Sequence, residues 1–209
     1  MQFQSFKDTL VFIVIFVLSL KDNETAKGAL TISKRHRIVI FGCGNILLGD
    51  DGVGPAVASA LKRRSLPHGV LVEDVGTGIR DRLFDYILSP ALCPEALVVI
   101  DAVRVAGYKP GQILKFRPSE IPPVKVSEFS LHQFPTVNLL AELEKELDVR
   151  VEIIGVQVDH LPDRICLGLS RHVAEKVKEV CDMVVRLCAS MIEDEKIFTD
   201  RASCPISSP

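Results

Sequence analysis

The sequence predicts an α/β fold: a three-layer sandwich in which helices cover both faces of a twisted, mostly parallel sheet. Short apolar runs rich in β-branched residues alternate along the chain with segments of helical period, which is typical of parallel sheets. The apolar runs are continuous rather than interrupted by polar residues, as expected for strands that are buried on both faces. With 209 residues, 47 % of them hydrophobic, the chain has the size and composition of one globular domain.

The clearest unit is residues 38–64, IVIFGCGNILLGDDGVGPAVASALKRR, which predicts a strand, a glycine loop and a helix. It opens with an apolar run, and Gly42 and Gly44 then allow the backbone to turn tightly. Asp50 and Asp51 follow at the point where the helix begins, a position that Asp favours as a capping residue. The apolar residues after them recur at helical spacing.

Alternation of the same kind continues along the chain. Further strands are expected at residues 70–75, 96–100, 112–116 and 151–158. Helices are expected at residues 80–88 and 137–147 and in one long segment that begins after Ser170. Because polar and apolar residues alternate in QILKF, the strand at 112–116 is expected at an edge of the sheet.

The folded domain is expected to span residues 34–192. Residues 1–33 form an extension, apolar over 10–20 and polar after it, which lies outside the fold. The apolar run is shorter than the roughly 20 residues that a membrane-spanning helix needs, and no cleavage site follows it closely. It is either a genuine anchor, with membrane contact only in that case, or the result of an incorrectly assigned start. Residues 193–209 are polar and rich in Pro and Ser, and we expect a flexible tail.

Composition excludes several classes of function. The net charge of −2 provides no basic surface for nucleic acid, and the absence of Trp leaves few platforms for stacking bases. The six cysteines form no Cys-x-x-Cys pair and no zinc-binding spacing. They are interpreted as small, mostly apolar residues of a protein in a reducing compartment.

A strand followed by a glycine loop and a helix also suggests a Rossmann-like nucleotide-binding protein. In that alternative, Glu73 or Asp74 at the end of the second strand would bind a ribose. The fingerprint Gly-x-Gly-x-x-Gly is incomplete, however, because its third glycine is replaced by Leu47. A helix start attracts phosphate, but Asp50 and Asp51 place negative charge there and favour a cation instead.

Ligands of open α/β sheets bind beyond the carboxyl ends of the strands. Asp51 follows the first strand, Asp101 ends the run ALVVID, and His132 lies in the loop before the helix at 137–147. Two carboxylates and one imidazole that converge at one edge would suit a borderline divalent metal ion. His160 lies in the acidic segment VDHLPD, which is interpreted as a surface loop.

Several motifs resemble those of the hydrogenase maturation proteases, over about residues 38–187. GCGNILLGDDGVGPAVASAL resembles their N-terminal signature, in which Asp51 corresponds to an acidic metal contact. DAVRVAG resembles the second motif, whose leading Asp would be Asp101, and SLHQF resembles the third, whose His would be His132. IIGVQVDHLPDRICLGLS resembles the segment that leads into the last helix. One departure is Arg104, since this position is often acidic in the family.

The resemblance implies a cytoplasmic endopeptidase of the aspartic type. Its partner would be the precursor large subunit of a nickel–iron hydrogenase, from which it removes a C-terminal peptide. Asp51, Asp101 and His132 would be its catalytic and metal-contacting residues, and the nickel would be supplied by the substrate. The spacing around SLHQF suggests the branch that serves coenzyme-F420-reducing hydrogenases.

Two questions about the chemistry stay open at the level of sequence. Either carboxylate could serve as general base, and a non-enzymatic nickel metallochaperone would use the same three residues. Cys43, in the glycine loop, is a poor candidate for a nucleophile. Neighbouring carboxylates would raise the pKa of its thiol, whereas catalysis needs a thiolate.

Overall fold

The computed structural model describes residues 37–120 and 134–202, and within them all side chains except those of 134–136 and 195–202. One sheet holds the strands β1 (Ile38–Cys43), β2 (Val70–Gly76), β3 (Ala96–Val103), β4 (Ile113–Phe116) and β5 (Arg150–Gln157). The α-helices are α2 (Val53–Leu61), α3 (Ile79–Leu88), α4 (Phe134–Leu147), α5 (Arg171–Ala174) and α6 (Val177–Ala202). Short 3-10 helices are η2 (Gly49–Gly52), η3 (Pro90–Leu92) and η4 (Pro118–Glu120).

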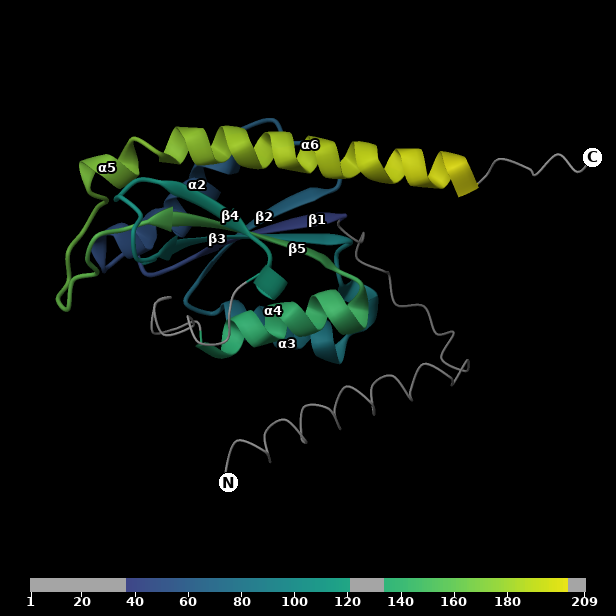
Figure 1. The fold of residues 1–209 in the computed structure, drawn as a ribbon, viewed down its shortest axis with the longest axis horizontal. Coiled ribbons are helices and arrows are strands. Elements are labelled where there is room, and N and C mark those ends of the chain that lie inside the picture. Colours follow the sequence, from purple (N-terminus) through teal and green to yellow (C-terminus); the bar gives the residue numbers. More distant parts are fainter. Residues whose placement is uncertain (1–36, 121–133, 203–209) are drawn as a thin grey trace, which may run out of the picture.

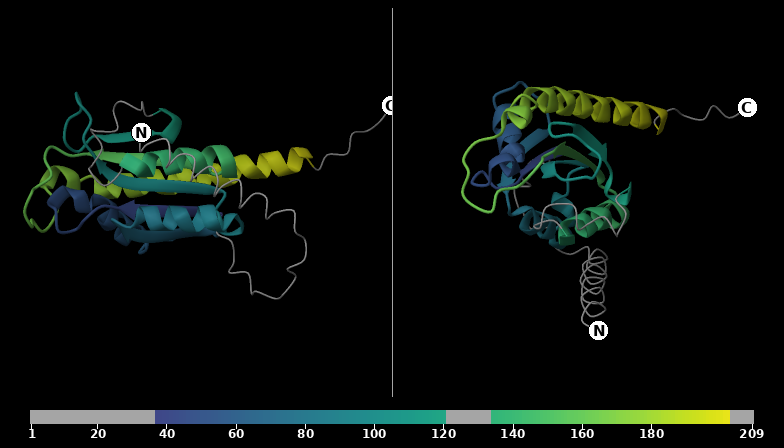
Figure 2. Two further views of the ribbon diagram at one scale, coloured as in Figure 1. Left: turned by 90° about the horizontal axis from the view of Figure 1, so that it is seen from below. Right: turned by 60° about the vertical axis from the view of Figure 1, so that its left-hand side comes forward.

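The sheet has the order β2-β1-β3-β5-β4. Strands β2, β1, β3 and β5 run parallel, and β4 pairs antiparallel with β5 at the edge. Helices α2 and α6 lie on one face of the sheet and α3 and α4 on the other (Figures 1 and 2). The predicted three-layer α/β fold is confirmed, and so is the edge position of the fourth strand.

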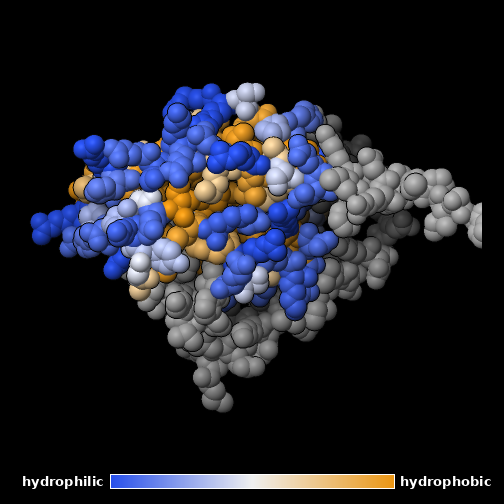
Figure 3. Space-filling view, turned by 45° about the horizontal axis from the view of Figure 1, so that its top comes forward, coloured by the Kyte–Doolittle hydropathy of each residue, from blue (hydrophilic) through white to orange (hydrophobic). Residues whose placement is uncertain are grey.

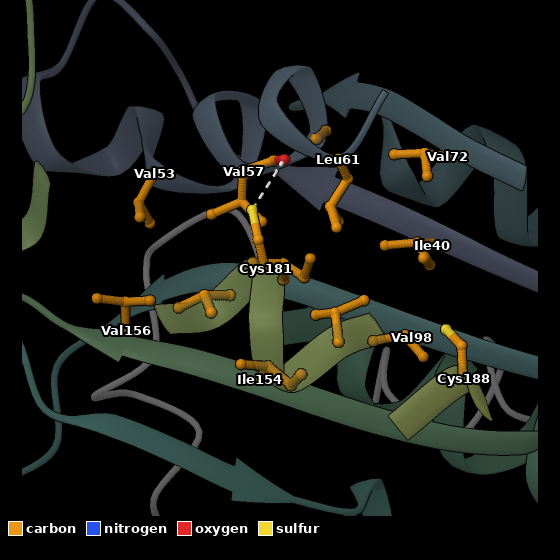
Figure 4. Packing of buried hydrophobic residues seen from close by; sticks show 14 of the residues in the cluster. Ile40, Val53, Val57, Leu61, Val72, Val98, Ile154, Val156, Cys181 and Cys188 are labelled. Carbon is orange, nitrogen blue, oxygen red and sulfur yellow. Dashed lines mark hydrogen bonds between the residues drawn. The ribbon is translucent and has the colours of Figure 1, made fainter. Parts of the chain in front are cut away.

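The core divides into two layers because side chains along a strand point to alternate faces. In β1, Ile38 and Ile40 pack with α2 and α6, whereas Val39 and Phe41 pack with α3 and α4. Figure 4 shows the first layer, in which the Cys181 thiol of α6 points at the Val57 carbonyl of α2 (Sγ to O, 3.9 Å). Burying each aliphatic side chain stabilises the fold by roughly 1.5–3 kcal/mol, so these two layers hold the strand ends in place.

The C-terminal helices differ from the single long helix expected after Ser170. Helix α5 is one short turn, and α6 then begins at Val177. Helix α6 continues to Ala202, so the segment 193–209, expected as a flexible tail, begins as helix. The physical reason is that EDEKIFTDRA contains no Gly or Pro that would end the helix.

The surface over this layer is mixed in character. On the face shown in Figure 3, hydrophobic residues form a central zone with charged residues around it. Half-buried apolar residues of α6, among them Met183 and Leu187, pack against the core beneath. Among residues 37–120 and 134–202, no helix combines the length and the apolar character required to cross a membrane. The apolar run 10–20 and the extension 1–33 lie outside these residues.

Candidate active site

The site is built on glycines that bring α2 close to the ends of β1 and β3. A Cβ atom on Gly54 would lie 2.1 Å from the Cys43 carbonyl oxygen and 2.5 Å from that of Ile100. Gly44, with φ of +122°, leaves room for the Asp51 carbonyl, which would lie 1.8 Å from a Cβ there. Side chains at these positions would push the helix and its preceding turn away from the sheet. The glycines of the sequence motif therefore place η2 against the carboxyl ends of the strands.

Asp51 is held in η2 with only 2 % of its surface exposed. The backbone N–H of Asn45 donates to its Oδ2 atom at 2.7 Å. The Asn45 side chain in turn orders the loop, because its Oδ1 accepts a hydrogen bond from the Leu47 N–H at 3.0 Å. The Asp51 N–H donates to the Leu48 carbonyl at 3.2 Å. The carboxylate is thus fixed by the loop in which it lies.

Asp101 lies near the carboxyl end of β3 and is 3 % exposed. Its Oδ1 atom accepts a hydrogen bond from the Ala102 N–H at 2.8 Å. Burial raises the pKa of this carboxyl well above its ordinary value, and the negative charge of Asp51 raises it further, while the Ala102 hydrogen bond opposes the rise. The close approach at Gly54 places η2, which carries Asp51, beside the end of β3, which carries Asp101, in agreement with this effect of Asp51.

Cys43, at the end of β1, is buried beside the same carboxylates. Burial raises the pKa of its thiol well above the ordinary value, and the charges of Asp101, Asp74 and Asp51 add to the rise. The prediction of a raised pKa is confirmed. A thiol that is held protonated is a poor nucleophile, so Cys43 serves in packing.

Asp50 has a partner that the sequence did not indicate. The N-cap residue of η2 is Leu48, and no side-chain capping bond is made there. The Oδ1 atom of Asp50 instead accepts a hydrogen bond from the Ser170 N–H at 2.6 Å, which joins η2 to the start of α5. No local signal could reveal this contact, since the two residues are 120 positions apart.

Gln157, at the end of the apolar strand β5, is a buried polar residue for which the sequence predicted no role. Its Oε1 atom accepts a hydrogen bond from the Val105 N–H at 2.9 Å, and its Nε2 donates to the Val158 carbonyl at 3.2 Å. Gln157 therefore holds the loop that leaves β3 just after Asp101. A buried amide inside a run of apolar residues was the available signal.

His132, the third candidate, lies outside the described residues. Within residues 37–120 and 134–202, no three His, Cys, Asp or Glu side chains are grouped so that they could hold a metal ion. His160 is exposed in the loop after β5, as expected of a surface residue. The described part of the site is therefore the pair Asp51 and Asp101.

Comparisons with known proteins point to one family. The family model HycI, hydrogenase maturation protease, matches residues 55–187. A protein of Methanocaldococcus jannaschii that bears the name of a hydrogenase maturation protease is 33 % identical over 154 residues, which are 73 % of this chain and 96 % of the relative. Coenzyme F420 hydrogenase subunit delta of Methanothermobacter thermautotrophicus is 33 % identical over 153 residues, 71 % of this chain and 92 % of the relative.

The fold is also shared with a solved structure, the hydrogenase maturating endopeptidase HybD from Escherichia coli. The two superpose with a TM-score of 0.62 and 26 % identity, over 74 % of this chain and 93 % of HybD. The family match covers more than half of the chain, from Pro55 in α2 to beyond β5, and it includes β3, which carries Asp101. The chain therefore belongs to the hydrogenase maturation protease family.

Proposed function

We propose that this chain matures a nickel–iron hydrogenase by removing the C-terminal peptide of its nickel-loaded large subunit. The observation that carries the proposal is the pair of buried carboxylates, Asp51 and Asp101, at the carboxyl edge of the sheet. They come from two elements, η2 and β3, that the close contact at Gly54 brings together. Membership of the family supplies the reaction class, a peptidase, and the precursor large subunit as its partner.

The charges of the pair favour a substrate that carries a cation. Two carboxylates buried against each other are costly when both are ionised, and the raised pKa of Asp101 expresses that cost. A divalent ion beside them removes the cost because it attracts both. Nickel accepts carboxylate and imidazole ligands, and we assign His132 as the third contact. The metal belongs to the precursor, so the contacts form only in the enzyme–substrate complex.

In this proposal the two carboxylates bind the substrate and take part in the proton transfer. Asp51 and Asp101 hold the nickel-bearing end of the precursor at the sheet edge, and one of them accepts the proton of the attacking water. The nickel of the substrate polarises the peptide carbonyl or orients that water. The attack needs no cysteine, in agreement with the raised pKa of the Cys43 thiol. The enzyme is thus a peptidase of aspartic type.

The setting of the reaction follows from the cysteines and the relatives. All cysteines of the described residues are free thiols, which fits a reducing compartment and supports a cytoplasmic location. Similarity to the delta subunit of coenzyme F420 hydrogenase supports a substrate in that branch. Arg104, at a position often acidic in the family, directly follows β3, the strand that carries Asp101, and would affect how the precursor docks. We assign the peptidase domain to residues 34–192.

The test is incubation of the full chain with a nickel-loaded precursor large subunit, followed by measurement of the intact mass. Loss of mass that matches a C-terminal peptide supports the proposal. A nickel metallochaperone would leave the mass unchanged and would hold stoichiometric nickel when isolated, whereas the peptidase should bind nickel weakly without its substrate. A nucleotide-binding protein would instead bind NAD or ATP and no nickel.

A further inference from the structure

Four large apolar side chains are exposed on two neighbouring loops at the edge of the site. Ile46 and Leu47 precede η2 and are 61 % and 43 % exposed, and Ile165 and Leu167 precede α5 and are 73 % and 74 % exposed. We call these four residues the apolar rim. Among the described residues, the large exposed apolar side chains outside the rim are Leu88, Leu92 and Tyr108.

The two loops of the rim form one ordered surface. The Cys166 N–H donates to the Leu47 carbonyl at 2.9 Å, and the Gly49 N–H donates to the Cys166 carbonyl at 2.7 Å. The strand-like pairing of Leu48 with Cys166 therefore fixes the rim residues on both sides of it. Farther along the chain, the Ser170 N–H donates to Asp50 Oδ1 at 2.6 Å and joins the same two loops a second time. A surface that is already ordered loses little conformational entropy when a partner binds.

The rim is continuous with the catalytic loop. Ile46 and Leu47 lie between Asn45, whose N–H holds the Asp51 carboxylate, and η2, which carries that carboxylate. A polypeptide that binds at Asp51 therefore comes close to the rim. Apolar side chains at loop tips do not stabilise the folded chain, since they remain in water, and a cluster of them marks an interaction surface.

We propose that the apolar rim docks an apolar segment of the precursor large subunit next to the bond that is cut. The proposal rests on the proposed function, since it gives the substrate of that site a second point of attachment. The two parts of the surface have separate tasks. The carboxylates recognise the metal, and the rim recognises the chain by burying apolar area on both partners.

The rim can be tested with variants that leave the carboxylates untouched. The variant Ile165→Ser with Leu167→Ser removes its two most exposed side chains, and Ile165→Val with Leu167→Met keeps their apolar character. Leu88→Ser is the matched control, because Leu88 is 59 % exposed but ends α3 at the opposite edge of the sheet. For each full-length variant, kcat and KM are measured on the nickel-loaded precursor, beside a thermal melt and the native mass.

The serine variant should raise KM at least about tenfold with kcat and melting temperature little changed, as expected for loss of docking contacts. The apolar variant and Leu88→Ser should keep the wild-type KM.

An unchanged KM in the serine variant overturns the inference while the proposed function stands. An equal rise in the apolar variant would trace the effect to loop shape and also overturn it. So would a smaller native mass with unchanged KM, which would make the rim a contact between copies of this chain. If the wild-type chain cleaves no precursor, the proposed function fails and the rim proposal with it.

Discussion

The Asp101 carboxyl both accepts a hydrogen bond and carries a buried charge. A substitution that removes only the charge therefore separates its chemical role from its part in packing. The variant Asp101→Asn keeps an oxygen that can accept the Ala102 N–H, but it removes the buried charge. Processing of the nickel-loaded precursor should fall by about 100-fold or more, the scale of a lost catalytic acid or base. The melting temperature at neutral pH should be unchanged or higher, because the amide avoids the repulsion from Asp51. Normal cleavage by this variant would remove Asp101 from the mechanism.

The raised pKa of Asp101 also predicts how stability depends on pH. The folded chain binds this proton more tightly than the unfolded chain, whose carboxyl has its ordinary pKa of 3.8. The stability contributed by the protonated form is therefore complete below that pH and is lost as pH rises through the raised pKa. Relative to Asp101→Asn, the wild-type melting temperature should fall as pH increases above about 4. A difference in melting temperature between the wild-type chain and Asp101→Asn that stays constant at every pH would contradict this.

At the scale of elements, the contact between α2 and the strand ends depends on Gly54. In Gly54→Ala the added methyl would meet backbone atoms of Cys43 and Ile100, which cannot turn away as a flexible side chain would. The free energy of unfolding should fall by about 3 kcal/mol or more, as measured by chemical denaturation. Gly78→Ala is a milder comparison, since its methyl would lie 3.3 Å from the Val75 carbonyl. A Gly54→Ala variant as stable as Gly78→Ala would show that the close contact is unimportant.

The elements that sequence could predict were those with a strong local pattern. The continuous apolar runs gave the buried strands, and the alternation in QILKF gave the edge position of β4. It was also predictable that Asp51 and Asp101 lie at the same edge of the sheet, because parallel strands end at the same edge. The partners of Asp50 and Gln157 were not, since each depends on a residue distant in sequence. The break between α5 and α6 carries no Gly or Pro and was missed for that reason.

At the scale of the whole molecule, the described layers predict that the extension can be removed. Strand β1 begins at Ile38, and among the described residues 37–120 and 134–202 both core layers form a closely packed unit around the sheet. Deletion of residues 1–33 should therefore leave a folded domain that unfolds cooperatively and still processes the precursor. Thermal melts of the full-length and shortened chains compare the two. Loss of the cooperative transition would show that the apolar run 10–20 packs into the domain.

The central claim is that Asp51, Asp101 and His132 act together on the nickel that the precursor carries. The most direct measurement is the intact mass of nickel-loaded and nickel-free precursor after incubation with the wild-type chain and with His132→Gln and His160→Gln. We expect that the wild-type chain and His160→Gln remove the C-terminal peptide from loaded precursor only, and that His132→Gln removes it from neither. Cleavage of nickel-free precursor at the same rate, or normal cleavage by His132→Gln, would contradict it.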